Sequence, residues 1–217
     1  MIRIVTCPVG LLQANCYLAF SEETKRGFLV DPGGMAEKIS RFVTQYGMKP
    51  EAILLTHGHF DHIAAADKLR CQYGVPVLAG LGEERVLGDP LNNLSGVYTL
   101  HAFTLEADRL LSDGEELSVA GYRIRTIRTP GHSEGGVCYE LPEEGILFSG
   151  DTLFQGSYGR VDGPDGDPEE MFRSLTRLFN ELPGDTRVLP GHGGETSIEE
   201  ERLTNPALLD LTERDYI

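Results

Sequence analysis

The densest group of side chains able to do chemistry lies within residues 56–62, which read Thr56-His57-Gly58-His59-Phe60-Asp61-His62. This stretch holds three of the six histidines in the protein, and a carboxylate stands beside the last of them. Neutral imidazole is the commonest metal ligand in proteins, and carboxylate is its usual oxygen partner. Burying these four groups together without a cation would leave them desolvated and repelling one another. We therefore predict metal binding by His57, His59, Asp61 and His62.

The neighbouring residues indicate how this group is positioned. Ile53, Leu54 and Leu55 form a short apolar run that predicts a buried strand, and residues 63–72 predict a helix. Gly58 lets the backbone turn between the two histidines without a side chain in the way. A strand end that leads into a helix start is where α/β folds usually place their chemistry.

Three later turns repeat the same arrangement. Each follows a short predicted strand and ends in a ligand-type residue: Pro130-Gly131-His132, Ser149-Gly150-Asp151 and Pro190-Gly191-His192. Any one of them would be weak evidence, because a lone histidine in a Pro-Gly turn is usually structural. Together they would converge on one rim of a sheet. Five histidines and two aspartates suffice for two divalent ions, and their nitrogen and oxygen donors favour zinc, iron or manganese over calcium or magnesium.

The remaining pattern predicts an alternation of strands and helices. Further short strands are expected over residues 2–7, 16–20, 27–31, 75–79, 117–119, 122–128, 136–141, 145–149 and 187–189. Helices are expected over 36–46 and 168–182, the latter with Asp167 as N-cap, and Ser197 begins a final acidic helix. This order places helices outside a sheet. We expect residues 1–217 to form a single domain.

Residues 80–107 stand out by lacking a regular pattern beyond a short helix at 83–87. A long irregular stretch in an enzyme often borders the substrate, so we predict that this segment governs specificity. His101 lies in it without a ligand-type neighbour and is expected to be structural or exposed. Outside it, Asp31 in the turn Asp31-Pro32-Gly33-Gly34 is either a plain turn residue or an acceptor that orients a neighbouring loop.

Composition restricts the partners and the compartment. The formal net charge of −15 argues against nucleic-acid binding, which needs clustered Lys and Arg. No apolar run approaches the roughly 20 residues that span a bilayer, so no membrane association is expected. The N-terminus lacks a signal-peptide core, which favours the cytoplasm. The cysteines Cys7, Cys16, Cys71 and Cys138 form no Cys-x-x-Cys pair and are expected to be reduced, buried thiols.

Taken in order, these motifs resemble the metallo-β-lactamase fold superfamily. The matching pieces are Asp31-Pro32-Gly33, Thr56-His57-x-His59-x-Asp61-His62, Pro130-Gly131-His132, Ser149-Gly150-Asp151 and Pro190-Gly191-His192. The resemblance implies an α/β fold, an αβ/βα sandwich of two mixed β-sheets with helices on the outer faces. It also implies two divalent metal ions, with Zn²⁺ favoured and iron or manganese as alternatives. One ion would be held by His57, His59 and His132, the other by Asp61, His62 and His192, and Asp151 would bridge them.

Within that superfamily the sequence is most similar to glyoxalase II, and more narrowly to its short bacterial relatives. The similarity lies in residues 153–162, which follow Asp151, and in residues 199–206. It implies a cytoplasmic metallohydrolase that cleaves a small-molecule thioester, with Asp61 orienting the nucleophile or accepting its proton. Full-length glyoxalase II carries a further helical domain after its last histidine, and this sequence ends soon after His192. Glutathione specificity is therefore left open.

Other functions are compatible with the same ligand types. A persulfide dioxygenase with a single iron keeps much of the motif, and a lactone hydrolase shares the hydrolytic set. A non-enzymatic di-iron redox module is disfavoured because no flavin or rubredoxin-like segment is present. True β-lactamases of this superfamily lack the bridging aspartate and are exported, which disfavours that activity. Arg160 and Asp162 are expected to form a structural ion pair beneath the site.

Overall fold

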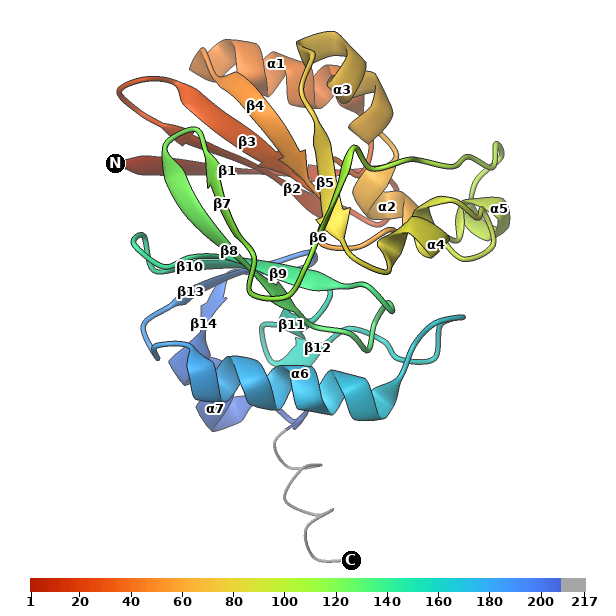
Figure 1. Cartoon of the computed structure of the whole chain (residues 1–217), viewed down its shortest axis with the longest axis vertical. Helices are drawn as coiled ribbons and strands as arrows, with labels where there is room; N and C mark the ends of the chain where they lie inside the picture. The colour runs from red at the N-terminus through yellow and green to blue at the C-terminus, as the bar shows by residue number, and fades with distance from the viewer. Residues whose placement is uncertain (208–217) are drawn as a thin grey trace, which may run out of the picture.

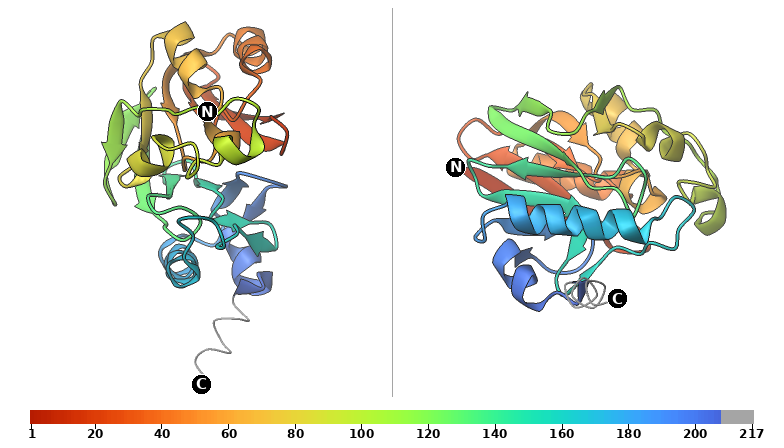
Figure 2. Two further views of the ribbon diagram at one scale, coloured as in Figure 1. Left: turned by 90° about the vertical axis from the view of Figure 1, so that its right-hand side faces the viewer. Right: turned by 60° about the horizontal axis from the view of Figure 1, so that its bottom comes forward.

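Two six-stranded β-sheets pack face to face, and helices cover their outer faces (Figure 1). The computed structural model describes residues 1–207. The two further views show the same layering, with the helices of the N-terminal half and those of the C-terminal half on opposite outer sides (Figure 2). The predicted αβ/βα sandwich is therefore confirmed.

The first sheet is built by the N-terminal half. Its order is β1 (Ile2–Val9), β2 (Ala14–Ser21), β3 (Arg26–Val30), β4 (Lys49–Leu54), β5 (Val77–Gly80) and β6 (Arg109–Leu111). The first three strands are antiparallel and joined by short turns, whereas β3 to β6 run parallel. Parallel neighbours need crossover connections. The helices α1 (Ala36–Tyr46) and α3 (Ala66–Tyr73) provide two of them on the outer face.

The second sheet is built by the C-terminal half. Its strands are β7 (Glu116–Val119), β8 (Tyr122–Arg128), β9 (Val137–Leu141), β10 (Ile146–Gly150), β13 (Arg187–Pro190) and β14 (Thr196–Ser197), in the order β14-β13-β10-β9-β8-β7. The parallel pair β10 and β13 is connected through α6 (Pro168–Glu181). A small hairpin, β11 (Leu153–Phe154) and β12 (Ser157–Tyr158), follows β10, and α7 (Ile198–Thr204) follows β14.

Three apolar layers hold the sandwich together. Between the sheets lie large, fully buried side chains such as Phe28, Tyr139 and Phe148. Burial of an aromatic or aliphatic side chain of this size contributes about 1.5–3 kcal/mol each. Two further clusters fill the spaces between each sheet and its helices, around Ile39 under α1 and around Leu175 under α6.

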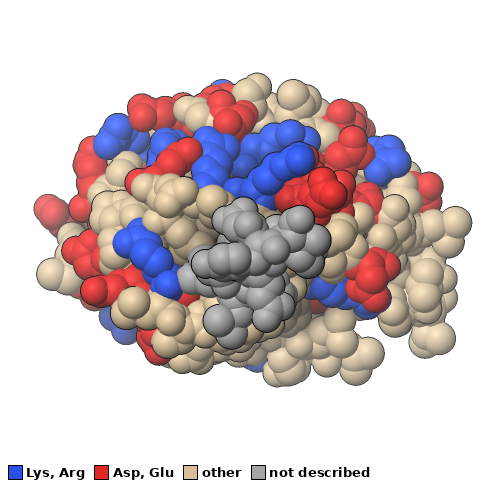
Figure 3. Space-filling model, turned by 90° about the horizontal axis from the view of Figure 1, so that it is seen from below, with Lys and Arg blue, Asp and Glu red and all other residues tan. Residues whose placement is uncertain are grey.

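The two long helices begin and end where the sequence predicts. Asp167 caps α6 by accepting hydrogen bonds from the backbone N–H groups of Glu169 and Glu170, and Pro168 occupies the first helical position. Gly47 ends α1 in a left-handed conformation, with φ of 63°. The outward face of α6 is charged, and ion pairs such as Arg177 with Asp113 lie along it. Seen from below, a band of basic side chains is bordered by acidic ones (Figure 3).

Several expected boundaries and environments are wrong. The helix predicted over 63–72 is two shorter helices, α2 (Phe60–Ile63) and α3, because the backbone N–H of Ala65 donates to the Pro32 carbonyl instead of continuing one helix. The sequence missed the short strands β6, β11, β12 and β14 and the helix α5 (Ser95–Tyr98), while the short helix α4 (Glu83–Leu87) is confirmed. Cys71 is exposed, and the other three cysteines are buried and free as expected. Within residues 1–207, no helix is both long and apolar enough to cross a membrane.

Candidate metal centre

Hydrogen bonds between the two sheets bring the ends of distant strands together. The backbone N–H of Asn15 in β2 donates to the Gly191 carbonyl at 2.7 Å, and the hydroxyl of Tyr17 donates to the Pro190 carbonyl at 2.7 Å. In the opposite direction, the backbone N–H of Val137 donates to the Thr56 carbonyl at 2.9 Å. The turns after β4 and β13 are thereby held at one edge of the sandwich.

All seven side chains proposed from the sequence meet at this edge. Six of them form two groups of three, His57 with His59 and His132, and Asp61 with His62 and His192. Within each group the potential ligand atoms all lie within 4.8 Å of one another. His101, by contrast, is exposed on the 80–107 segment and belongs to neither group.

Asp151 lies between the two groups. Its Oδ1 is 3.4 Å from His62 Nε2, and its Oδ2 is 3.6 Å from both His132 Nε2 and His192 Nε2. Gly191 makes this approach feasible, because a Cβ there would stand 2.2 Å from Asp151 Oδ1 and 2.7 Å from His62 Cε1. The carboxylate therefore contacts both donor groups at once.

Several donor atoms face one another across the centre, and some of them have no hydrogen-bond partner. His59 Nδ1 is 2.9 Å from His132 Nε2, and His62 Nε2 is 3.3 Å from His192 Nε2. His57 Nε2 and Asp151 Oδ1 are buried and have no hydrogen-bond partner within residues 1–207. Buried polar atoms are normally satisfied, so each such atom needs an explanation. Divalent cations fit this donor set, since each would be shared by several of these atoms.

The surroundings shift the pKa values of histidines in the two groups in opposite directions. Burial, together with the neighbouring ring of His132, lowers the pKa of His59 to about 3, and burial likewise lowers the pKa of His57. Burial also opposes charging of His62, but Asp151, Asp61 and Asp31 raise its pKa to about 10. His57 and His59 in one group are thus held neutral, whereas His62 in the other group favours a positive charge among carboxylates. A bound cation would take the place of that proton.

Asp31 acts as the acceptor that orients this site. One carboxylate oxygen accepts from the backbone N–H of Thr56 at 2.7 Å, and the other accepts from the Thr56 hydroxyl at 2.6 Å and from His62 Nδ1 at 3.1 Å. His57 Nδ1 lies 3.1 Å from the same Thr56 hydroxyl oxygen. Both histidines are therefore held with Nε2 facing the centre, as ligand histidines usually are. Although Asp31 could group with His57 and His62 as a ligand, its oxygens are already occupied.

Glu83, at the start of α4, is a supporting residue that sequence reasoning missed. Its side chain is fully buried and accepts hydrogen bonds from the Ser133 hydroxyl and from the backbone N–H of Gly135. Its other oxygen lies beside Gly58, where a Cβ would stand 2.8 Å away. Burial raises the pKa of Glu83 to about 7, against the hydrogen bond from Ser133. The carboxyl joins the loop carrying His57 and His59 to the loop carrying His132.

A pocket of about 410 Å³ opens over the paired groups. His59, Asp61, His132, Asp151 and His192 are among the residues on its floor, and its walls are largely apolar. Arg160 also lines it and forms a bidentate ion pair with Asp162, at 2.7 and 3.1 Å. The predicted ion pair is confirmed, but both side chains are exposed, and Arg160 lines the pocket instead of lying beneath the site.

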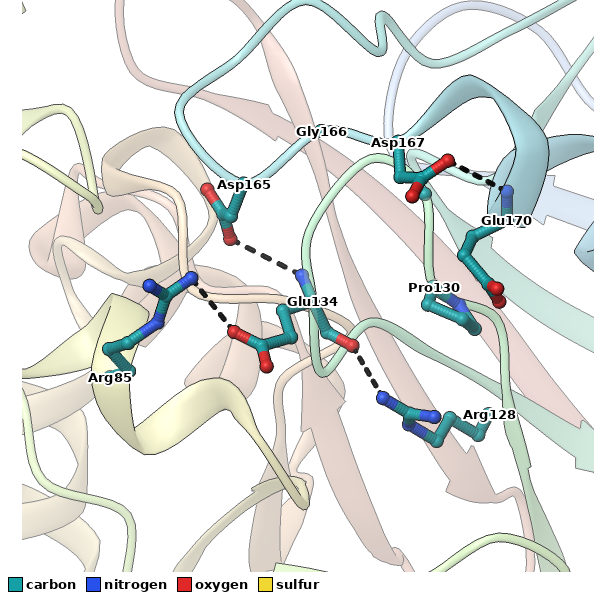
Figure 4. A pocket seen from close by; sticks show the side chains of 9 residues that line it. Arg85, Arg128, Pro130, Glu134, Asp165, Gly166, Asp167 and Glu170 are labelled. Carbon is teal, nitrogen blue, oxygen red and sulfur yellow. Dashed lines mark hydrogen bonds and ion pairs between the residues drawn. The ribbon is translucent and has the colours of Figure 1, made fainter.

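A second pocket, of about 430 Å³, differs in character. Its charged side chains are engaged with one another and with the backbone: Arg85 pairs with Glu134 at 2.8 Å, and Arg128 donates to the Glu134 carbonyl at 3.0 Å. Asp165 accepts from the Glu134 backbone N–H at 3.2 Å (Figure 4). It contains none of the clustered histidines. The site of chemistry is therefore the apolar-walled pocket.

The fold and the paired donor groups define a metallo-hydrolase scaffold with a metal-binding His/Asp cluster. The family model of the metallo-beta-lactamase superfamily matches residues 9–192. The chain belongs to this superfamily, as predicted from its motifs.

Two curated relatives cover nearly the whole chain. A probable metallo-hydrolase, YqgX, of Bacillus subtilis (strain 168) is 39% identical over 202 residues, which cover 93% of this chain and 95% of the relative. The hydroxyacylglutathione hydrolase GloC of Haemophilus influenzae is 33% identical over 210 residues, which cover 95% of this chain and 98% of the relative.

Solved structures agree with the fold. The crystal structure of BLEG-1, described as a B3 metallo-beta-lactamase, has a TM-score of 0.89 at 38% identity and covers 96% of this chain and 99% of its own. The structure of TTHA1623 in a di-iron-bound form has a TM-score of 0.81 at 38% identity and covers 93% of this chain and 98% of its own. These two neighbours share the fold of this chain; one is described by its class, B3 metallo-beta-lactamase, and the other by its di-iron-bound form.

Proposed function

We propose that this protein is a thioester hydrolase that uses two divalent metal ions. The observation that carries the proposal is the pair of donor groups joined through Asp151. One group has three imidazole donors, and the other has two imidazoles and a carboxylate. Two ions about one shared carboxylate suit attack on a carbonyl from one side and departure of a leaving group on the other.

We assign His57, His59 and His132 to one ion and Asp61, His62 and His192 to the other, with Asp151 shared between them. The mixed nitrogen and oxygen set supports zinc, and iron or manganese would also suit it. The di-iron form of TTHA1623 supports iron as the alternative. When bound, the ions would lower the pKa of a water molecule and polarise the substrate carbonyl.

The residues of the chain hold and orient the reactants. Asp61 Oδ2 lies 3.2 Å from His192 Nε2 and 3.6 Å from His62 Nε2, and its side chain also lines the pocket. This placement supports a role for Asp61 in orienting the nucleophile and accepting its proton. His132 donates from Nδ1 to the Arg160 carbonyl at 2.8 Å, which keeps its Nε2 directed to the centre.

The thioester substrate is supported by the relative GloC, whose name describes a hydroxyacylglutathione hydrolase. Metal analysis of the purified protein, followed by assay of thioesters, lactones and glutathione persulfide, tests the proposal. We expect two ions per chain and release of free thiol from thioesters. Oxygen uptake on the persulfide with one iron per chain would instead establish a dioxygenase, and cleavage of lactones alone would establish a lactonase.

A second candidate, β-lactam hydrolysis, is supported by the likeness to BLEG-1. Adding a chromogenic β-lactam to the same panel separates the two activities. If kcat/KM for the β-lactam exceeds that for every thioester, the thioesterase proposal is wrong.

A further inference from the structure

The walls of the metal-side pocket come from four separate segments. Leu12 belongs to the turn between β1 and β2, Phe60 begins α2, and Phe154 lies in β11. Leu94 and Tyr98 come from the segment inserted between β5 and β6, within residues 80–107. All five side chains present apolar surface to the pocket above the clustered histidines.

The inserted segment is anchored directly to the metal-side helix. The backbone N–H of Phe60 donates to the Asn93 carbonyl at 2.8 Å. The Asn93 side chain donates to the Phe103 carbonyl at 2.8 Å and accepts from the Ser95 backbone N–H at 2.8 Å. Asn93 and Ser95 are fully buried. The position of the segment is therefore set relative to Asp61, the next residue along α2.

Two side chains of this segment are placed toward the pocket rather than the core. Leu94 has a left-handed backbone, with φ of 66°, which residues with a side chain rarely adopt. Tyr98 stacks on Phe60, with ring centroids 5.8 Å apart and an interplanar angle of 20°. Phe60 is buried but Tyr98 is 54% exposed, so its ring offers apolar surface to a ligand.

The charge of the pocket does not match a highly charged substrate. Arg160 is the one Arg or Lys among its described lining residues, and Asp162 already neutralises it through a bidentate pair. The carboxylate of Asp162, helped by the hydroxyl of Tyr98, raises the pKa of Arg160. An anionic group of the substrate would have to compete with this pair. The walls offer apolar contact without such competition.

We propose that Leu94 and Tyr98 form a specificity wall that receives an apolar acyl group, so that the preferred substrates are thioesters of aliphatic or aromatic acids rather than of small hydroxy acids. This inference rests on the proposed thioesterase function. The acyl side is the suitable occupant because the scissile carbonyl must reach the floor of the pocket. The thiol portion then extends toward the opening.

The test uses one thiol with different acyl groups: the acetyl, lactoyl, hexanoyl and phenylacetyl thioesters of N-acetylcysteamine, with metal-loaded protein. We expect kcat/KM to rise at least about tenfold from acetyl to hexanoyl, since each buried methylene improves transition-state binding. In Tyr98→Ala and Leu94→Ala, kcat/KM for hexanoyl should fall more than that for acetyl. Leu100→Ala is the control, because Leu100 is 97% exposed on the same segment and does not line the pocket.

Two different failures can be distinguished. Equal kcat/KM for all four acyl groups, or a preference for lactoyl, would contradict the proposed specificity wall. Neither result would contradict the proposed thioester hydrolase function. If no thioester is cleaved, the proposed function is wrong, and calorimetry with hexanoate and acetate still tests the wall. Tighter binding of hexanoate that is lost in Tyr98→Ala would support the wall, and equal binding of both acids would overturn it.

Discussion

The floor and the wall of the metal-side pocket are held in different ways. On the floor, His132 and His62 are buried and each donates its second ring nitrogen to a carbonyl or carboxylate. On the wall, Leu12 and Tyr98 are about half exposed and contribute apolar contact. Hydrogen-bonded positions tolerate little displacement, whereas apolar contact can be rearranged at small cost. The molecule thus combines a floor fixed by buried hydrogen bonds with a wall of partly exposed apolar side chains.

The two regions also differ in origin. The floor draws on both sheets, because His57 follows β4 and His192 follows β13, and hydrogen bonds across the sandwich hold their turns together. Leu94 and Tyr98 of the wall both come from one insertion between β5 and β6. A change in the wall should therefore alter selectivity without disturbing the sheets.

The largest effect is expected from removing a floor ligand. His57→Ala or Asp61→Ala should lower kcat/KM at least about a thousandfold and reduce the bound metal, because each variant loses a donor from one proposed ion site. Circular dichroism should show an intact fold. His101→Ala, which alters an exposed histidine, should retain activity. Full activity in either floor variant would contradict the ligand assignment.

The next effect concerns the support beneath the floor. The folded pKa of Glu83, about 7, lies above its ordinary value of 4.5, so the folded protein holds this proton more tightly than the unfolded chain. In the wild type, protonated Glu83 therefore makes its full contribution to the free energy of unfolding below pH 4.5. This contribution is lost as the pH rises to 7. Gln does not titrate, so Glu83→Gln does not lose this contribution. Between pH 4.5 and 7, the free energy of unfolding of Glu83→Gln should therefore rise by about 3 kcal/mol relative to that of the wild type.

Urea unfolding of metal-free protein at pH 4.5 and 7 measures this difference. Glu84→Gln, which makes the same change at the exposed neighbouring position, provides a matched control. A constant difference between Glu83→Gln and wild type at both pH values would show that Glu83 does not titrate in this range.

A smaller effect is expected from Asp31→Asn, which keeps the shape but loses one acceptor. The amide cannot accept from both the Thr56 hydroxyl and His62 Nδ1 at the former Oδ2 position. Metal affinity should fall about ten- to a hundredfold, as is typical when the partner of a ligand histidine is lost. Competition with a chelator measures it, with Asp67→Asn on the exposed face of α3 as the control. Unchanged metal affinity would show that the hydrogen bonds of Asp31 are not needed to orient the proposed metal ligands.

The smallest effect is expected at the edge of the wall. Leu12 is 52% exposed, so Leu12→Ala removes little buried apolar area. We expect a change of about two- to threefold in kcat/KM for the hexanoyl thioester. A loss as large as that of a floor variant would break the distinction between floor and wall.

Local patterns in the sequence predicted much of the molecule. The apolar spacing and end signals of α1 and α6 are contained within each segment, so both helices appear where expected. The seven ligand-type residues were predicted as a set because they follow the ends of short apolar strands, near Gly or Pro turns. The break between α2 and α3 escaped prediction, because it depends on a hydrogen bond from Ala65 to Pro32 in another turn.

The sequence by itself determined the chemical types available to the site, namely imidazoles and carboxylates at successive strand ends. Only the tertiary structure decided which of them share a centre and what surrounds it. Glu83, Asn93 and Tyr98 acquire their positions from loops that meet across the fold, and nothing in their immediate sequence marks them. The physical reason is that sheet packing and hydrogen bonds between distant segments leave no local periodicity to detect.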